Sequence, residues 1–238
     1  MGGVDGDAGS GGEAYSRGRI DKRQAIVRAA FDVFARDGYA QASVDAIAAA
    51  AGVAKPTIYN HFGAKENLFR VVMADVGRRA TAATLEVLGA FPAEPDDLRA
   101  ELTQLGRRLT TCFADPVSTS LRRLLHAEIV RFPDLLDEVR AGAATPVIDA
   151  LAGPLARLAT AGHLQLSDPI RASNQFIALI GDELPALTAL GTRPAPPEQI
   201  DAVVTAGVDT FLRAFGTADN SPALGDPDPH AATTSHPT

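Results

Sequence analysis

The chain has 238 residues, of which 46% are hydrophobic and 21% charged, and its formal net charge is −7. This apolar fraction is enough for a sizeable core, so the composition excludes a disordered protein. The single cysteine, Cys112, excludes an intrachain disulfide, and no uncharged apolar run is long enough to cross a bilayer. The amino terminus also lacks the apolar stretch of a signal peptide, so we expect a cytoplasmic protein without a membrane partner.

The charge is distributed unevenly along the chain. Residues 17–79 carry eleven Lys and Arg against six Asp and Glu, a net charge of +5, whereas residues 80–238 carry eleven against twenty, a net charge of −9. All three lysines, Lys22, Lys55 and Lys65, lie in the first of these segments. Because phosphate binding requires only a local basic surface, the acidic total does not exclude a nucleic-acid partner.

The chain begins with a predicted disordered arm, because residues 1–16 are rich in Gly and poor in apolar side chains. Arg17 and Arg19 follow it. A basic arm of this kind can enter a DNA minor groove, but a solvated charged tail explains the sequence equally well.

A first helix is predicted from Asp21, with Gln24 as its capping-box partner, to about Gly38. Its buried stripe comprises Ile26, Val27, Ala30, Phe31 and Phe34. We expect Tyr39 to pack beneath the segment that follows.

Residues 43–69 predict two short helices across a tight turn, followed by the start of another helix. Ser43 suits the N-cap of the first helix, and Gly52 ends it because glycine accepts the left-handed backbone conformation. Pro56 stands in the first turn of the second helix, where its missing N–H costs no hydrogen bond. Ile58 and Phe62 predict the buried side of that helix. The outer side, here called the recognition face, consists of Lys55, Pro56, Thr57, Tyr59, Asn60 and His61.

The recognition face contains hydroxyl, amide, aromatic and ammonium groups and no carboxylate. A helix of this size fits the major groove of double-stranded DNA, where such groups reach base edges and phosphates. We therefore predict that residues 53–61 form a recognition helix.

The run GVAKPTIYNHFGAKENLF, preceded by VDAIAAAAG, closely resembles the DNA-binding domain of TetR-type transcriptional regulators. The resemblance implies that Lys55 and Thr57 meet bases or flanking phosphates, and that Tyr59, His61 and Lys65 meet phosphates. The predicted DNA-binding residues are Ser43, Lys55, Pro56, Thr57, Tyr59, Asn60, His61 and Lys65. Family members often carry Ser or Asn where Ala64 stands, which leaves the side-chain cap of the fourth helix open.

Beyond the helix-turn-helix, every predicted segment has helical periodicity and none alternates as a strand does. A long fourth helix runs out of the DNA-binding unit along Leu68, Val72, Val76, Ala83 and Leu88. Residues 91–97, with two prolines and three acidic residues, separate it from the helices that follow. Among those, the helix predicted across residues 135–158 is expected to kink or split at Pro146 and Pro154.

Two final helices are predicted at residues 169–190 and 197–215, and the short loop between them predicts an antiparallel pair. The resulting fold is all-α with about nine helices. Its predicted parts are a disordered arm (1–16), a helix-turn-helix DNA-binding domain (17–80), a helical ligand-binding and dimerisation domain (81–216) and a disordered tail (217–238). The stretch from Leu121 through ALAGPLARLATAGHLQLSDP also resembles one carboxy-terminal subclass of these regulators, without naming a ligand.

By the same resemblance, the last two helices pair with their counterparts in a second subunit, giving a homodimer. The alternative is an ordinary core hairpin within one subunit, and the apolar pattern does not separate the two. The predicted interface residues are Ile177, Leu184, Val204, Val208, Phe211, Leu212 and Phe215.

A small apolar or amphipathic effector is the second expected partner, besides operator DNA. The candidate pocket residues, each of which has core packing as its alternative role, are Leu105, Leu109, Phe113, Leu125, Ile129 and Phe176. Arg122, Arg123 and Arg131 are candidates for an anionic ligand, against the commoner role of solvated arginines.

Other chemistry is not indicated. His126 and Glu128 stand two apart on a helix and point in different directions, and the histidines form no cluster with metal-ligand spacing. The sequence has no nucleophile elbow and no phosphate-binding glycine loop, so we predict no enzyme, no metal and no cofactor. Cys112, alone on an apolar helix, is interpreted as a packing residue rather than a redox sensor.

These patterns together predict a ligand-responsive dimeric DNA-binding transcriptional regulator, a repressor released from its operator by a small molecule. The alternative is a small-molecule-binding helical carrier or sensor that acts through a protein partner.

Overall fold

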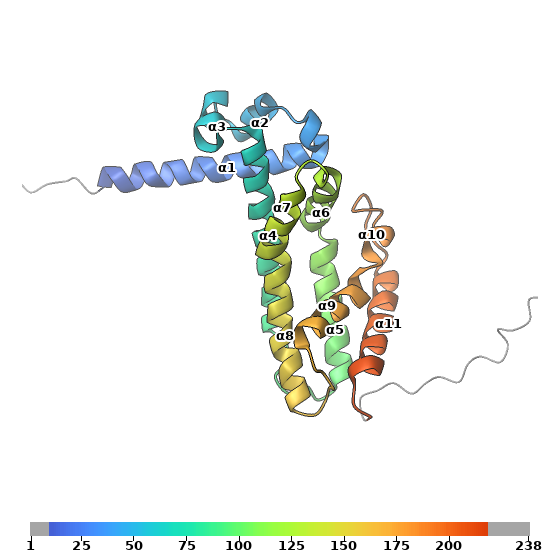
Figure 1. Cartoon of the computed structure of the whole chain (residues 1–238). Helices are drawn as coiled ribbons and strands as arrows, with labels where there is room; N and C mark the ends of the chain where they lie inside the picture. Colours follow the sequence, from blue (N-terminus) through green and yellow to red (C-terminus); the bar gives the residue numbers. More distant parts are fainter. Residues whose placement is uncertain (1–9, 219–238) are drawn as a thin grey trace, which may run out of the picture.

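The computed structural model describes residues 10–218, with side chains from residue 20 onward, and it contains helices and no strand within this range (Figure 1). The helices are α1 (Ser10–Gln41), α2 (Val44–Ala51), α3 (Lys55–Phe62), α4 (Lys65–Gly89), α5 (Leu98–Ala114), α6 (Pro116–Glu128), α7 (Pro133–Val139), the π-helical turn η1 (Arg140–Ala144), α8 (Thr145–Thr160), α9 (Pro169–Gly181), α10 (Leu184–Leu187) and α11 (Pro197–Phe215). α7, η1 and α8 run on without a break, and α10 is a single turn. The expected all-α fold of about nine helices is therefore confirmed for the described range.

The two ends of the described range differ from expectation. α1 begins at Ser10 rather than at Asp21, so residues 10–16 of the expected arm are helical; once a helix is nucleated, extending it costs little. Residues 1–9 and the side chains of Arg17 and Arg19 lie outside the described part. At the other end, Thr217 still donates its backbone N–H to the His163 carbonyl at 3.3 Å, and residues 219–238 of the expected tail lie outside the described range.

A first hydrophobic core unites the helix-turn-helix with two helices that follow much later in the chain. The rings of Tyr39 and Phe69 lie 4.8 Å apart, and the ring of Phe132 lies 5.0 Å from that of Tyr39. α1 to α4 supply most of this first core, and α6 to α7 complete it with Leu121, Leu124, Leu125, Phe132, Leu135 and Val139. The expected packing of Tyr39 is thus confirmed, and the DNA-binding segment does not enclose its own core.

A second hydrophobic core joins α5, α8, α9 and α11 with the far end of α4. α11 approaches two neighbours closely through glycines: a Cβ at Gly207 would lie 2.6 Å from the Leu179 carbonyl oxygen, and one at Gly106 would lie 2.7 Å from Val204 Cγ1.

α4 spans both cores, with Val76 in the first and Leu88 in the second. Figure 1 shows it running from the helix-turn-helix end of the molecule to the opposite end. The predicted domain boundary at residue 80 falls within this continuous helix. Ala83, which was predicted to belong to the buried apolar stripe of this helix, is exposed.

Prolines shape the later helices in two ways. The helix predicted over residues 169–190 was too long, because α9 ends at Gly181 and only the short α10 follows. Pro185 has no N–H to donate to the carbonyl of Gly181, which prevents the helix from continuing. The kink expected near Pro146 takes the form of η1 in the turn before it, whereas Pro154 lies inside α8.

The residues predicted for a dimer interface lie mainly inside the single chain. Leu184 is 3% exposed, and Val204, Val208, Phe211 and Leu212 are fully buried, so they have no surface left for a second subunit. Phe215 is half-buried with its ring 4.9 Å from that of Phe211, and Ile177 faces a cavity within the chain. The prediction was wrong for the five buried residues, because periodicity identifies an apolar face but not the molecule that covers it.

Candidate DNA-binding surface and effector cavity

The turn between α2 and α3 is built as its sequence predicts. The Ser43 hydroxyl caps α2 by accepting the Ala46 N–H at 3.0 Å. Gly52 adopts a left-handed conformation with φ 64°, and the Val53 N–H then bonds to the Ala48 carbonyl at 3.0 Å. α3 begins after this turn with Pro56 in its first turn, and α4 has no side-chain cap at Ala64. These contacts hold the two helices at a fixed angle.

The recognition face lies outward on α3. Lys55, Pro56, Tyr59 and Asn60 are exposed, while Thr57 and His61 are half-buried. Lys55 Nζ donates to Asp45 Oδ2 at 2.9 Å, and this hydrogen bond raises the pKa of Lys55. A DNA phosphate that contacts Lys55 must therefore compete with the carboxylate of Asp45.

Lys65 is held against the first core. Its ammonium lies 4.6 Å from the centre of the Tyr39 ring and donates to the Ala40 carbonyl at 3.3 Å. Burial, and after it the charge of Arg131, lowers the pKa of Lys65. Arg131 lies over the same ring, 5.2 Å from its centre. The phosphate contact expected of Lys65 remains a prediction, and the structure adds a cation–π contact that ties α4 to Tyr39.

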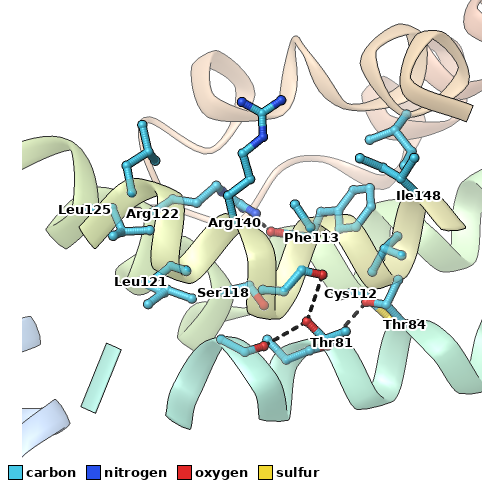
Figure 2. Close-up of a pocket in the computed structure, with 18 of the residues that line it drawn as sticks. Thr81, Thr84, Cys112, Phe113, Ser118, Leu121, Arg122, Leu125, Arg140 and Ile148 are labelled. Carbon is cyan, nitrogen blue, oxygen red and sulfur yellow. Dashed lines mark hydrogen bonds between the residues drawn. The ribbon is translucent and has the colours of Figure 1, made fainter. Parts of the chain in front are cut away.

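A cavity of about 470 Å³ lies where the two cores meet. Its walls come from α4, α5, α6, η1, α8 and α9, and from Leu136 and Val139 of α7. Thr81 and Thr84 line it from α4, but their hydroxyls bond to backbone carbonyls: Thr81 Oγ1 lies 2.9 Å from the Gly77 oxygen and 3.1 Å from the Ala143 oxygen (Figure 2). The cavity is mostly apolar and of a size that holds a drug-sized molecule.

The predicted pocket residues are only partly brought together. Phe113 and Leu125 line the cavity. Leu105, Leu109 and Phe176 are buried in the second core and do not face this cavity, although Leu105 borders a smaller hollow beside Phe91. Ile129 lies at the surface, 36% exposed, after the end of α6.

The polar residues of the cavity wall were only partly identified from the sequence. Arg122, a candidate for an anionic ligand with solvation as its commoner alternative, is half-buried and donates from Nη2 to the carbonyl of Phe113 in the last turn of α5. This burial lowers the pKa of Arg122. Arg140 and Asn174 also line the cavity and were not predicted as ligand contacts, and His126, which was considered only as a metal ligand, lines it as well. Small residues on the facing helices, such as Ala80 and Ala143, leave the space, but small residues are too common to mark a cavity in sequence.

Two family models match the chain. That of the bacterial regulatory proteins of the tetR family matches residues 26–72, and that of the AefR-like transcriptional repressor C-terminal domain matches residues 100–217. The HTH-type transcriptional repressor Rv3405c of Mycobacterium tuberculosis is 32% identical over 176 residues, which are 70% of this chain and 85% of that protein. The chain belongs to the TetR family of transcriptional regulators. The resemblance seen in residues 43–69 is thereby confirmed.

Solved structures agree with this assignment. A TetR-family transcriptional regulator from Mesorhizobium loti superposes with a TM-score of 0.76 at 27% identity, covering 84% of this chain and 98% of that one. The flavonoid-responsive regulator FrrA superposes with a TM-score of 0.65 at 30% identity, covering 83% of this chain and 98% of that one. The TetR fold thus extends over the carboxy-terminal domain as well as the helix-turn-helix.

Two sets of contacts join the cavity wall to the helix-turn-helix in this TetR-family regulator. Arg123 on α6 donates from Nη2 to the Ala35 carbonyl on α1 at 3.2 Å. Arg70 on α4 pairs with Asp134 at 2.9 Å and Glu138 at 3.3 Å on α7. The hydrogen bond between Arg70 and Asp134 raises the pKa of the arginine and lowers that of the aspartate. α6 and α7 therefore touch both the cavity and the DNA-binding end.

Residues 10–218 contain no group of three or more His, Cys, Asp or Glu side chains that could hold a metal ion. A search of the same residues finds no helix with the length and hydropathy needed to span a membrane.

Proposed function

We propose that this TetR-family protein is a dimeric repressor that a small apolar or amphipathic effector releases from its operator. The position of the cavity carries the effector part of the proposal. Its walls include α4 and α6, and both helices pack against α1 of the DNA-binding end. A molecule in the cavity therefore contacts the elements that hold the helix-turn-helix in place.

Operator binding follows from the recognition face. Two copies of α3 in a two-fold dimer must lie about 34–36 Å apart, or a multiple of that distance, to enter major grooves on one side of the duplex. In this arrangement Lys55, Tyr59 and His61 approach phosphates and Thr57 approaches a base edge. Ser43 and Pro56 set the helix geometry, and Asn60 lies at the outer side of the face.

Release follows from a shift of α4. An effector that enlarges the space between the two cores moves α4 and α6 relative to α8, and α4 carries α3 with it. The spacing of the two recognition helices then departs from the groove spacing and operator affinity falls. By linkage, the operator weakens effector binding by the same factor.

The sign of regulation and the existence of an effector have support from relatives. The carboxy-terminal match is to an AefR-like repressor, and Rv3405c is named a repressor. FrrA, at 30% identity, is named a flavonoid-responsive regulator. These names belong to those proteins, and they favour repression and ligand response in this chain.

Dimerisation is proposed through the outer side of α11, since its inner side is buried. Ala202, Ala206 and Thr210 are exposed and recur every fourth residue, so they form one stripe of small side chains that permits close approach of a second helix. Ala206→Arg is expected to convert the dimer to a monomer in sedimentation equilibrium. A dimer that persists in this variant would place the interface elsewhere.

The DNA-binding part is tested by selecting genomic fragments with the purified protein and titrating the best fragment against random DNA at two salt concentrations. A pseudo-palindromic site bound at least ~10³-fold more tightly than random DNA supports the proposal. Weak binding that ignores sequence refutes it and favours a carrier or sensor. With the site in hand, compounds are screened for release of the DNA, and release by none refutes the effector part.

A further inference from the structure

The effector cavity is positively charged within an acidic domain. Residues 80–238 have a net charge of −9. Yet the side chains that line the cavity in the described structure include Arg122, Arg140 and His126, and no Asp or Glu. By contrast, the smaller hollow beside Phe91 is lined by Glu101 as well as Arg108.

The two cavity arginines lack the carboxylate partner that several other arginines of the described structure have. Arg70, Arg99 and Arg107, for example, each pair with a carboxylate. Within residues 10–218 neither Arg122 nor Arg140 makes an ion pair, and the one side-chain hydrogen bond of Arg122 goes to the Phe113 carbonyl. Figure 2 shows Arg122 extending from α6 toward this carbonyl and Arg140 extending from η1.

The hydrogen bond to Phe113 fixes the guanidinium of Arg122 at the wall of the cavity. A half-buried cation without an anionic partner is unfavourable, because burial removes water without supplying a counter-charge. The lowered pKa of Arg122 reflects the same desolvation. An anion that enters the cavity would restore the missing partner through a charge-assisted hydrogen bond.

We infer that the effector is a monocarboxylate with an apolar body, whose carboxylate pairs with Arg122 while the body fills the space lined by Leu121, Leu125, Val147 and Ile148. Arg140, which is exposed, attracts the acid to the cavity rim. A single charge fits best because, of the two arginines that line the cavity, only Arg122 is half-buried, whereas Arg140 is exposed at the rim. This inference rests on the proposed function, in that it names the class of molecule that the effector cavity takes.

The test is calorimetric titration of the full-length dimer with three acids, each compared with its neutral amide: decanoate, 4-butylbenzoate and naphthalene-1-acetate. At least one acid is expected to bind about tenfold or more tightly than its amide, as a charge-assisted hydrogen bond implies. Arg122→Gln should abolish this preference, and Arg122→Lys should retain part of it. Arg157→Gln, at an exposed position on α8, is the matched control and should leave the preference unchanged.

Acids that bind no more tightly than their amides overturn the inference, and this comparison on the unaltered protein decides even if a variant does not fold. A preference that survives intact in folded Arg122→Gln overturns it as well. Operator release is measured separately. An acid that binds through Arg122 without weakening operator binding leaves the inference standing and refutes the proposed release mechanism. If only the amides release the operator and the acids do not bind, the inference is overturned and the proposed release mechanism stands.

Discussion

Replacing Gly207 by alanine should destabilise the protein by forcing α9 and α11 apart. The new methyl carbon would lie 2.6 Å from the Leu179 carbonyl oxygen and 3.0 Å from its carbonyl carbon. These are backbone atoms, so no side-chain rotation relieves the overlap. Overpacking of this kind costs about 1–3 kcal/mol, against a gain of about 0.5–1 kcal/mol for replacing a helical glycine. We expect a net loss of about 1 kcal/mol, which lowers the midpoint of thermal unfolding by about 2–4 °C for a chain of this size.

Thermal unfolding followed by far-ultraviolet circular dichroism measures this effect, at equal protein concentrations because dimerisation affects the midpoint. Gly153→Ala in α8 is the matched control. A Cβ there meets only Arg157 Nη1, at 3.7 Å, so the same substitution should stabilise the protein by about 0.5–1 kcal/mol. The reasoning fails if Gly207→Ala is as stable as Gly153→Ala, since α9 and α11 would then not be in close contact.

Three further predictions concern DNA binding. Asp45→Asn should tighten binding to specific and random DNA alike, because it frees Lys55 and removes a negative charge beside the phosphates. Fluorescence anisotropy at two salt concentrations measures the two affinities, and unchanged affinities contradict the prediction. Thr57→Ala should change which sequences bind while leaving affinity for random DNA unchanged, and equal losses on both would exclude base contact. Arg70→Gln should leave effector affinity unchanged but reduce the factor by which the effector weakens operator binding, because it removes the ion pair with Asp134. If this factor is unchanged, the ion pair does not couple the effector cavity to operator binding.

The helix-turn-helix could be predicted from sequence because its determinants are local. A cap at Ser43, a left-handed residue at Gly52 and a proline at the start of α3 each act within a few residues of themselves. The loop after α4 could be predicted for the same reason, because its prolines and acidic residues lie within residues 91–97 themselves. Pro185, which ends the helical run after Gly181, is also a local determinant, and the helix predicted over residues 169–190 was too long because this proline was not taken into account.

The cavity and the inner face of α11 depend on which segments meet in space. Val204 and Val208 have the spacing of an interface stripe, and the same spacing serves a core helix covered by α5 and α9. Leu109 was a reasonable pocket candidate as a large apolar residue, but large apolar residues fill space instead of leaving it. The cavity forms beside Ala80 and Ala143, whose small side chains give no periodic signal.

The shared first core has a consequence for protein engineering. Regulators of this kind are attractive parts for biosensors, in which the operator specificity of one protein is grafted onto the effector specificity of another. Here the rings of Tyr39 and Phe69 both pack against the ring of Phe132, so a graft that ends within α4 would place a foreign surface against the transplanted aromatic rings. A working chimera of this protein requires its α6 and α7 contact residues to be exchanged together with the amino-terminal segment, or the interface between them to be redesigned.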